Sequence, residues 1–121
     1  MILPSLGIVV AINHAVRQQD EWFDEPDEIH RVQAILAVAA QFSDPLVAAA
    51  GLASRIARAQ AFTEGNKRTA LLVARWVLDR NGVDGARVLP ADDRVVADLL
   101  VQAAMGADIE ADLIELFNAR T

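Results

Sequence analysis

The sequence predicts an all-α fold. Apolar residues recur at intervals of three and four along most of the chain, which is the spacing of one face of a helix. Convincing strand alternation is absent beyond Arg87-Val88-Leu89. Helix start and stop signals, such as Ser43-Asp44-Pro45 and Asn81-Gly82, separate the periodic segments. We therefore expect a compact bundle of about six helices around a central helix, with residues 1–121 forming a single domain.

Two helices and a loop are predicted in the first third of the chain. The first helix covers about Ser5 to Gln18 and has a broad apolar surface. The segment from Asp20 to Asp27 is predicted to be a loop, because Pro26 and five acids break the helical pattern. The second helix then runs from near Asp27 to about Gln41.

The third helix leads to the most informative part of the sequence. Asp44 is a favourable cap and Pro45 a favourable first-turn residue, so the helix should start there. Its apolar positions, at intervals of three and four, are Leu46, Ala49, Ala53 and Ile56. Continuing that step reaches Gln60, so this side chain is expected to point inward or toward a cleft.

Three more helices are expected after the middle of the chain. The fourth, about Asn66 to Arg80, should be the central helix, and Asn81-Gly82 supplies its left-handed stop. A turn-rich passage from Val83 to Ala91 follows. Asp92 or Asp93 can cap a fifth helix that ends near Met105-Gly106, and Asp108 can cap a sixth that ends at about Phe117.

Composition narrows the class of protein. The 121 residues carry a net charge of −6, which argues against a general nucleic-acid binder. Cysteine is absent, so disulfides and thiolate metal sites are excluded, which suits a cytoplasmic protein. The apolar N-terminal segment lacks a basic leader and soon becomes polar, so we expect neither a signal peptide nor a membrane span.

The start of the fourth predicted helix has the chemistry of an anion site. The first-turn N–H groups and the helix dipole already favour an anion there. Lys67 and Arg68 add two cations, and Glu64 offers a carboxylate to a magnesium ion that would arrive with a nucleotide. The alternative interpretation is an ordinary charged and solvated helix end.

The nine residues from Gln60 to Arg68 read Gln-Ala-Phe-Thr-Glu-Gly-Asn-Lys-Arg. They resemble the signature of the Fic/Doc (Fido) family, which is His-x-Phe-x-(Asp/Glu)-(Gly/Ala)-Asn-(Gly/Lys)-Arg. The Asn-Lys-Arg ending resembles the Doc branch, the toxins of death-on-curing modules. One position departs, because the catalytic His of the family falls at Gln60. The resemblance implies a Fido-like helical fold built around the motif helix.

The resemblance also implies a role for each motif residue. Phe62 would anchor the loop, Glu64 would hold the metal, and the phosphates would be bound by Gly65, Asn66, Lys67 and Arg68. Arg58 matches a basic position of Doc-like sequences, although a lone arginine late in a helix more often compensates the helix dipole.

The implied activity is transfer of a phosphoryl group, or of AMP, from ATP or another nucleotide with Mg²⁺ to a protein hydroxyl. Lys67 favours phosphoryl transfer, because Doc-like sequences have a lysine there and AMP-transferring members usually have a glycine. The amide of Gln60 has no pKa near neutrality and cannot act as a general base, so we expect impaired turnover. The inhibitory helix pattern Ser/Thr-x-x-x-Glu-Gly/Asn is not found, so an antitoxin protein in another chain is the expected inhibitor. Resemblance to Doc suggests a translation elongation factor as the target.

Three alternatives remain open at this stage. The chain could be a catalytically inactive relative that binds a nucleotide, an antitoxin or a translation factor. Gln60 could be an introduced or selected inactivation of a toxic enzyme. A helical regulatory or adaptor domain without nucleotide function is the third.

Other candidate sites are weak. His14 and His30 lack metal-ligand partners, and Asp27 and His30 form a surface-type pair. Trp22-Phe23 is either a core aromatic pair or a surface that binds a partner.

Overall fold

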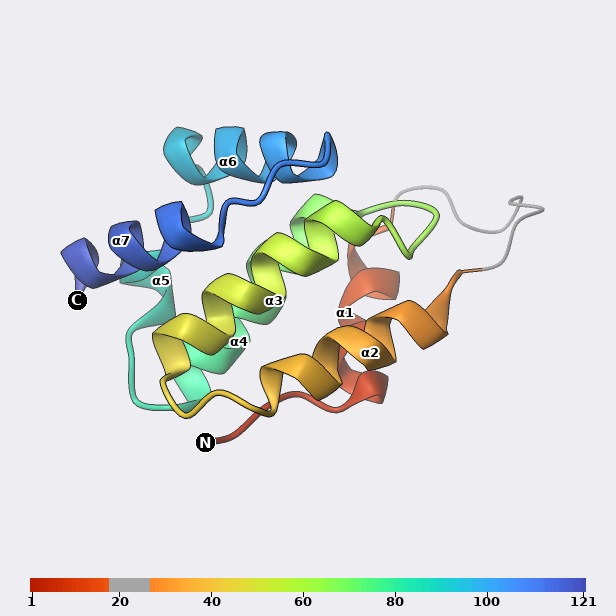
Figure 1. The fold of residues 1–121 in the computed structure, drawn as a ribbon, viewed down its shortest axis with the longest axis horizontal. Helices are drawn as coiled ribbons and strands as arrows, with labels where there is room; N and C mark the ends of the chain where they lie inside the picture. Colours follow the sequence, from red (N-terminus) through yellow and green to blue (C-terminus); the bar gives the residue numbers. More distant parts are fainter. Residues whose placement is uncertain (18–26) are drawn as a thin grey trace.

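A computed structural model describes residues 1–17 and 27–121, and all the regular structure in these residues is helical (Figure 1). The helices, in chain order, are α1 (Leu6–Val16), α2 (Ile29–Ala39), α3 (Pro45–Ala59), α4 (Asn66–Arg80), α5 (Gly85–Val88), α6 (Arg94–Ala104) and α7 (Glu110–Arg120). The all-α prediction is confirmed. The described residues contain seven helices rather than about six, because a short helix, α5, interrupts the passage predicted to be only turns.

α3 lies at the centre of the bundle. It packs against α2, α4, α6 and α7, and its most extensive contact is with α4 (Figure 1). Small side chains of α3 are buried on several sides of the helix and let its neighbours approach closely. They are Ala48, Ala49, Ala50, Ala53 and Ala57. α4, the predicted central helix, also packs against four helices, so α3 and α4 together form the centre of the bundle. α4 packs most extensively against α3 and also contacts α1, α5 and α6.

The core continues from the α3–α4 pair toward the C-terminal helices. Leu52 of α3 and Leu78 of α4 are fully buried, as are Leu113 and Phe117 of α7. Burying each such side chain stabilises the fold by roughly 1.5–3 kcal/mol. This core holds the α3–α4 pair, which carries the loop that contains the signature motif.

Most predicted helix boundaries follow from local capping chemistry. Asp44 accepts a hydrogen bond from the Leu46 N–H at 2.9 Å, with Pro45 as the first helical residue. Asp93 rather than Asp92 caps α6, accepting hydrogen bonds from two first-turn N–H groups. The glycine after α4, Gly82, adopts a left-handed φ of 81°, and Gly106 after α6 has a φ of 103°. These stops are where the sequence predicts them.

Other boundaries need correction. α2 begins at Ile29 rather than near Asp27, because the Asp27 carboxylate is engaged elsewhere and Glu28 has a non-helical ψ of 67°. α2 also ends at Ala39 rather than at Gln41. The last helix extends past Phe117 to Arg120, whose side chain is held by an ion pair to Asp93 at 2.5 Å.

Some of the predicted features fall on residues that the structure does not describe. The expected loop from Asp20 to Pro26, the Trp22-Phe23 pair and the expected end of the first helix at Gln18 all lie outside them. α1 ends at Val16, with Arg17 as its cap. No helix in residues 1–17 or 27–121 combines the length and the hydrophobicity that a membrane crossing requires.

Candidate functional site

The motif loop connects α3 to α4 and is bounded by two residues in the left-handed conformation. Gln60, directly after α3, has a φ of 52°, and Gly65, directly before α4, has a φ of 78°. Glycine suits the second position because it has no Cβ. A Cβ at Gly65 would approach Val16 Cγ2 to 3.2 Å. The two reversals fold residues 60–65 into a compact turn between the two central helices.

The loop is closed from within by Asn66. Its Oδ1 accepts a hydrogen bond from the Phe62 N–H at 3.1 Å, and its Nδ2 donates to the Phe62 carbonyl oxygen at 2.9 Å. The Phe62 ring is buried and anchors the loop in the core. The side chain of Asn66 is thus occupied in holding Phe62. Its predicted contribution to phosphate binding is left to its backbone N–H.

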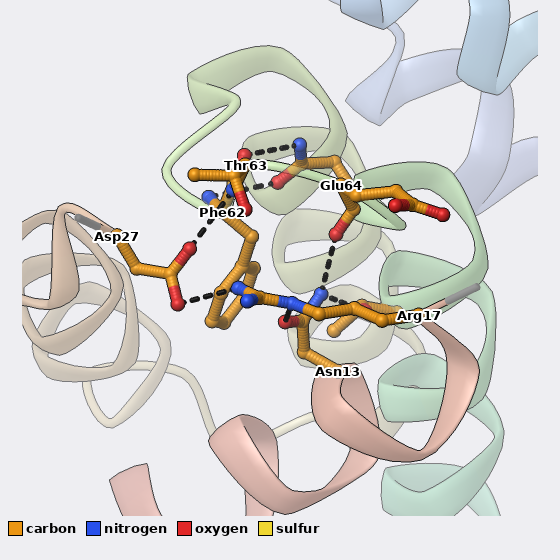
Figure 2. Close-up of polar contacts among 8 residues, drawn as sticks. Asn13, Arg17, Asp27, Phe62, Thr63 and Glu64 are labelled. Atoms are coloured by element: carbon orange, nitrogen blue, oxygen red, sulfur yellow. Dashed lines mark hydrogen bonds and ion pairs between the residues drawn. The ribbon is translucent and has the colours of Figure 1, made fainter. Parts of the chain in front are cut away.

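A buried polar network holds the loop from the side of α1 (Figure 2). Asn13, which is fully buried, donates through Nδ2 to the Glu64 carbonyl oxygen at 2.8 Å and to Thr69 Oγ1 at 3.1 Å. Arg17 Nε donates to Asn13 Oδ1 at 2.6 Å. The Glu64 carbonyl before Gly65 and the Thr69 side chain after it are therefore tied to α1 by hydrogen bonds that span more than 50 residues of sequence.

The network continues from Arg17 to Asp27. The Arg17 guanidinium forms an ion pair with the Asp27 carboxylate, and these side chains are only 7% and 13% exposed. Figure 2 shows Arg17 lying between Asn13 and Asp27. The second oxygen of Asp27, Oδ1, accepts from the Thr63 N–H at 2.9 Å. Asp27 therefore binds α1 and the motif loop at once, which replaces the surface pair with His30 that the sequence suggested.

The environment of Asp27 favours its charged form. Burial raises the pKa of this carboxyl, but hydrogen bonds from Arg17 and from the Thr63 N–H, together with the positive charge of Arg17, outweigh it and leave the pKa below its usual value. The ion pair is thus intact at neutral pH, and the loop is held by a charge-assisted contact.

Five consecutive residues, Glu64 to Arg68, line one pocket, with Val16 of α1 completing it. We call this the polar pocket; its volume is about 220 Å³. Lys67 and Arg68 are exposed, and Glu64 is half-buried. The N-cap residue of α4 is Gly65, which has no side chain to accept from the first N–H groups of the helix, so this helix start can bind an anion. The structure thus brings together around one concavity the acid, the glycine, the amide and the two cations that the sequence singled out.

A second pocket begins at the same two cations. It lies between α4 and α6, has a volume of about 210 Å³, and is lined by Lys67, Arg68, Leu71, Pro90, Val96 and Leu100 among others. We call this the apolar groove. Because Lys67 and Arg68 line both pockets, the polar pocket and the apolar groove are adjacent, with these two cations at their boundary.

Gln60 lines neither of these pockets. Its side chain is exposed, and its Nε2 donates to the Ala104 carbonyl oxygen, at the end of α6, at 3.1 Å. Of the two orientations expected for Gln60, inward or toward a cleft, the inward one is wrong, because α3 ends at Ala59 and the helical spacing does not extend to position 60. The left-handed backbone of Gln60 directs the side chain toward α6 instead.

Arg58 is also separate from the motif cations. It is exposed and lines a different pocket, together with Arg31 of α2 and Arg55 of α3. The structure therefore does not place Arg58 beside Lys67 and Arg68, with which the sequence grouped it.

Sequence reasoning missed Asn13, Arg17 and Thr69 as supports of the site. One signal was available for Asn13, since it lies four residues after Val9 and three before Val16, on the face of α1 that packs on the bundle. A polar residue at such a position must find buried partners. The identity of those partners depends on the fold, and the spacing alone does not give them.

Comparison with known proteins adds one finding. The model of the Fic/DOC family matches residues 6–78, which is more than half of the chain and includes α1 to α3, the motif loop and most of α4. No curated protein matches the sequence.

Proposed function

The chain belongs to the Fic/DOC family, and we propose that it is a Doc-like toxin of a toxin–antitoxin pair, transferring a phosphoryl (or AMP) group from a nucleotide to a protein hydroxyl. The observation that carries this proposal is the junction of the polar pocket and the apolar groove at Lys67 and Arg68. A nucleotide has the same division, because its phosphates are charged and one face of its base is apolar. Binding pockets typically combine an apolar lining with a few polar groups in this way.

In this proposal the phosphates bind at the start of α4. The first-turn N–H groups and Lys67 bind phosphate oxygens, and the planar guanidinium of Arg68 can donate two hydrogen bonds to one phosphate. Gly65 lets the backbone come close to the ligand, since no Cβ stands in the way. The base would lie in the apolar groove, against side chains such as Leu71 and Val96.

The site fits Mg²⁺ that arrives with the nucleotide. No group of three or more His, Cys, Asp or Glu side chains within residues 1–17 and 27–121 could hold a metal ion alone. Glu64 lines the polar pocket, and one protein carboxylate suffices where phosphate oxygens and water complete the octahedral shell. When bound, Mg²⁺ neutralises charge that develops on the phosphates. Asn13 and Asp27 keep the Glu64 segment of the loop in place for that contact.

Gln60 makes the proposed transfer slow. Replacing a general base by an amide typically costs about 10²–10⁴ in rate. Positioning and charge neutralisation supply much of the catalysis of phosphoryl transfer, so a residual rate is expected. The same residue favours the second candidate, a catalytically inactive Fido-fold protein with a binding or regulatory role, because its amide is bound to the Ala104 carbonyl oxygen outside the two pockets.

The toxin hypothesis implies two protein partners, an antitoxin and a target. Resemblance to Doc suggests a translation elongation factor as the target.

The test is the substitution Gln60→His. Histidine supplies a base with a pKa near neutrality and is among the residues that adopt a positive φ more readily, so the backbone at position 60 can accept it. Expression without antitoxin should arrest growth more strongly than the Gln60 form does. Label transfer to protein in a cell extract should rise by about 10²–10⁴, from ATP labelled at the γ-phosphate for phosphoryl transfer or at the α-phosphate for AMP transfer.

The control is a Gln60→His protein that also carries Arg68→Ala. It should lose the gained transfer, because the exposed Arg68 side chain is needed for the phosphates. A Gln60→His protein that binds ATP and transfers neither label would reject the toxin activity in favour of the inactive candidate.

A further inference from the structure

A third pocket lies on the face of the bundle formed by α2, α3 and the turn after α6. We call it the arginine pocket. Its volume is about 520 Å³, and three of its lining residues, Arg31, Arg55 and Arg58, are arginines. The remaining lining residues are small or apolar: Ala34, Ile35, Ala59 and Gly106. The lining of the pocket therefore combines three cationic side chains with small and apolar ones.

Two of the arginines are partly neutralised and held in place. Arg55 Nε donates to Glu110 Oε1 of α7 at 2.7 Å, which leaves the two terminal nitrogens of its guanidinium outside this bond. Arg31 Nη1 donates to Glu28 Oε2 at 2.7 Å. Arg58 is exposed, and no ion pair with a residue in the described part of the chain involves it. With three cations and two paired acids, the arginine pocket is locally positive in a protein whose net charge is −6.

This combination selects a class of ligand. The planar guanidinium group matches a carboxylate in shape, with two parallel hydrogen bonds. Ile35 and the two alanines offer contact to an apolar side chain beside that carboxylate. A polyanion as long as a nucleic acid would be opposed by the overall negative charge of the protein. We propose that the arginine pocket docks an acidic peptide segment, with an apolar residue among its carboxylates, from a protein partner.

The location of the pocket indicates which partner this is. Ala59 lines it, and the next residue, Gln60, occupies the position at which the family acts on a hydroxyl. The bond from Gln60 to Ala104 spans the gap between α3 and the end of α6, two residues before Gly106 of the same pocket. A segment docked on the arginines would thus run past position 60. On the proposed function, on which this step rests, the docked segment belongs to the protein substrate.

The experiment measures peptide binding to the full chain by fluorescence anisotropy. The probe is a short fluorescein-labelled peptide in which glutamates flank a leucine and a serine. The comparison peptide has glutamine in place of every glutamate. The acidic peptide should bind and the glutamine peptide should not, and Arg58→Gln should weaken binding about 5-fold, as for a partly exposed ion pair. Arg94→Gln, which removes the same charge from an exposed arginine outside the pocket, should leave affinity unchanged.

Several results would overturn this inference. Equal affinity of wild type and Arg58→Gln would do so, as would equal binding of both peptides or no binding of either. Loss of binding in Lys67→Gln, with Arg58→Gln unaffected, would assign the peptide to the polar pocket. Inorganic phosphate that binds in an Arg58-dependent way while the acidic peptide does not would show a small-anion site.

The proposed function is tested separately by titrating ATP into the same preparations. Peptide binding without ATP binding would reject the proposed function and leave the docking site in place. ATP binding without peptide binding would reject only the docking site. Arg58→Gln is a suitable test variant because Arg58 forms no ion pair with the residues that the structure describes, so the substitution breaks no such contact of the folded chain. Arg31→Gln provides a second variant on another helix.

Discussion

Asn13 offers the sharpest test of how the motif loop is held. Its side chain is fully buried and makes three hydrogen bonds, to the Glu64 carbonyl oxygen, to Thr69 Oγ1 and from Arg17 Nε. Asn13→Ala removes all three and leaves a small cavity. A buried polar group that loses its partner costs about 1–3 kcal/mol. The Glu64 carbonyl oxygen and Thr69 Oγ1 each lose a donor, whereas Arg17 keeps its ion pair, so these two acceptors and the cavity dominate the cost. We expect a loss of about 2–4 kcal/mol in the free energy of unfolding.

The assay is urea denaturation at neutral pH, followed by circular dichroism, which reports helix content. The midpoint should fall while the slope stays unchanged, because the substitution alters stability and not the surface exposed on unfolding. Asn118→Ala is the matched control. Asn118 is exposed, and its Nδ2 donates to the Ile114 carbonyl oxygen of the same helix at 3.0 Å. This substitution should lower the free energy of unfolding by less than about 0.5 kcal/mol. An Asn13→Ala cost as small as that of Asn118→Ala would refute the view that α1 holds the loop.

Two further predictions concern the same loop. The pKa of Asp27 is lowered in the folded state, so its contribution to stability is present above the unfolded pKa of about 3.9 and is lost as pH falls through the folded value. The difference in unfolding free energy between wild type and Asp27→Asn should therefore be large at neutral pH and shrink in acid. A difference that does not change with pH would contradict this prediction. Gly65→Ala should cost more than Gly82→Ala in the same denaturation assay. Both positions carry the left-handed penalty of about 1–2 kcal/mol, but only at Gly65 does a new Cβ meet a side chain, Val16 Cγ2 at 3.2 Å; equal costs would show that Val16 moves away freely.

Local signals predicted the parts of the fold that depend on neighbours in the sequence. Asp44 and Pro45 fix the start of α3, and Gly82 fixes the stop after α4, through bonds and backbone conformations within a few residues. The grouping of Glu64 to Arg68 around one pocket is equally local, because consecutive residues at a helix start share one end of the helix.

The remaining features depend on contacts between distant segments. Asn13 and Glu64 are 51 residues apart, and Asp27 and Thr63 are 36 apart, so no periodicity links them. The inward orientation considered for Gln60 fails because helical spacing assumes that the helix continues, whereas α3 ends one residue earlier. Arg58 was grouped with the motif by resemblance, but its position on the turn of α3 before the loop directs it to the arginine pocket.

Calorimetric titration of ATP with Mg²⁺ tests most directly the claim that the start of α4 is a nucleotide site. We expect saturable binding that stabilises the fold by about 2.7 kcal/mol at a hundredfold excess over the dissociation constant. Arg68→Ala should weaken the affinity, and Arg94→Ala, which removes an exposed arginine that lines neither the polar pocket nor the apolar groove, should not. No binding at millimolar ATP, or binding that Arg68→Ala and Lys67→Ala both leave unchanged, would contradict it.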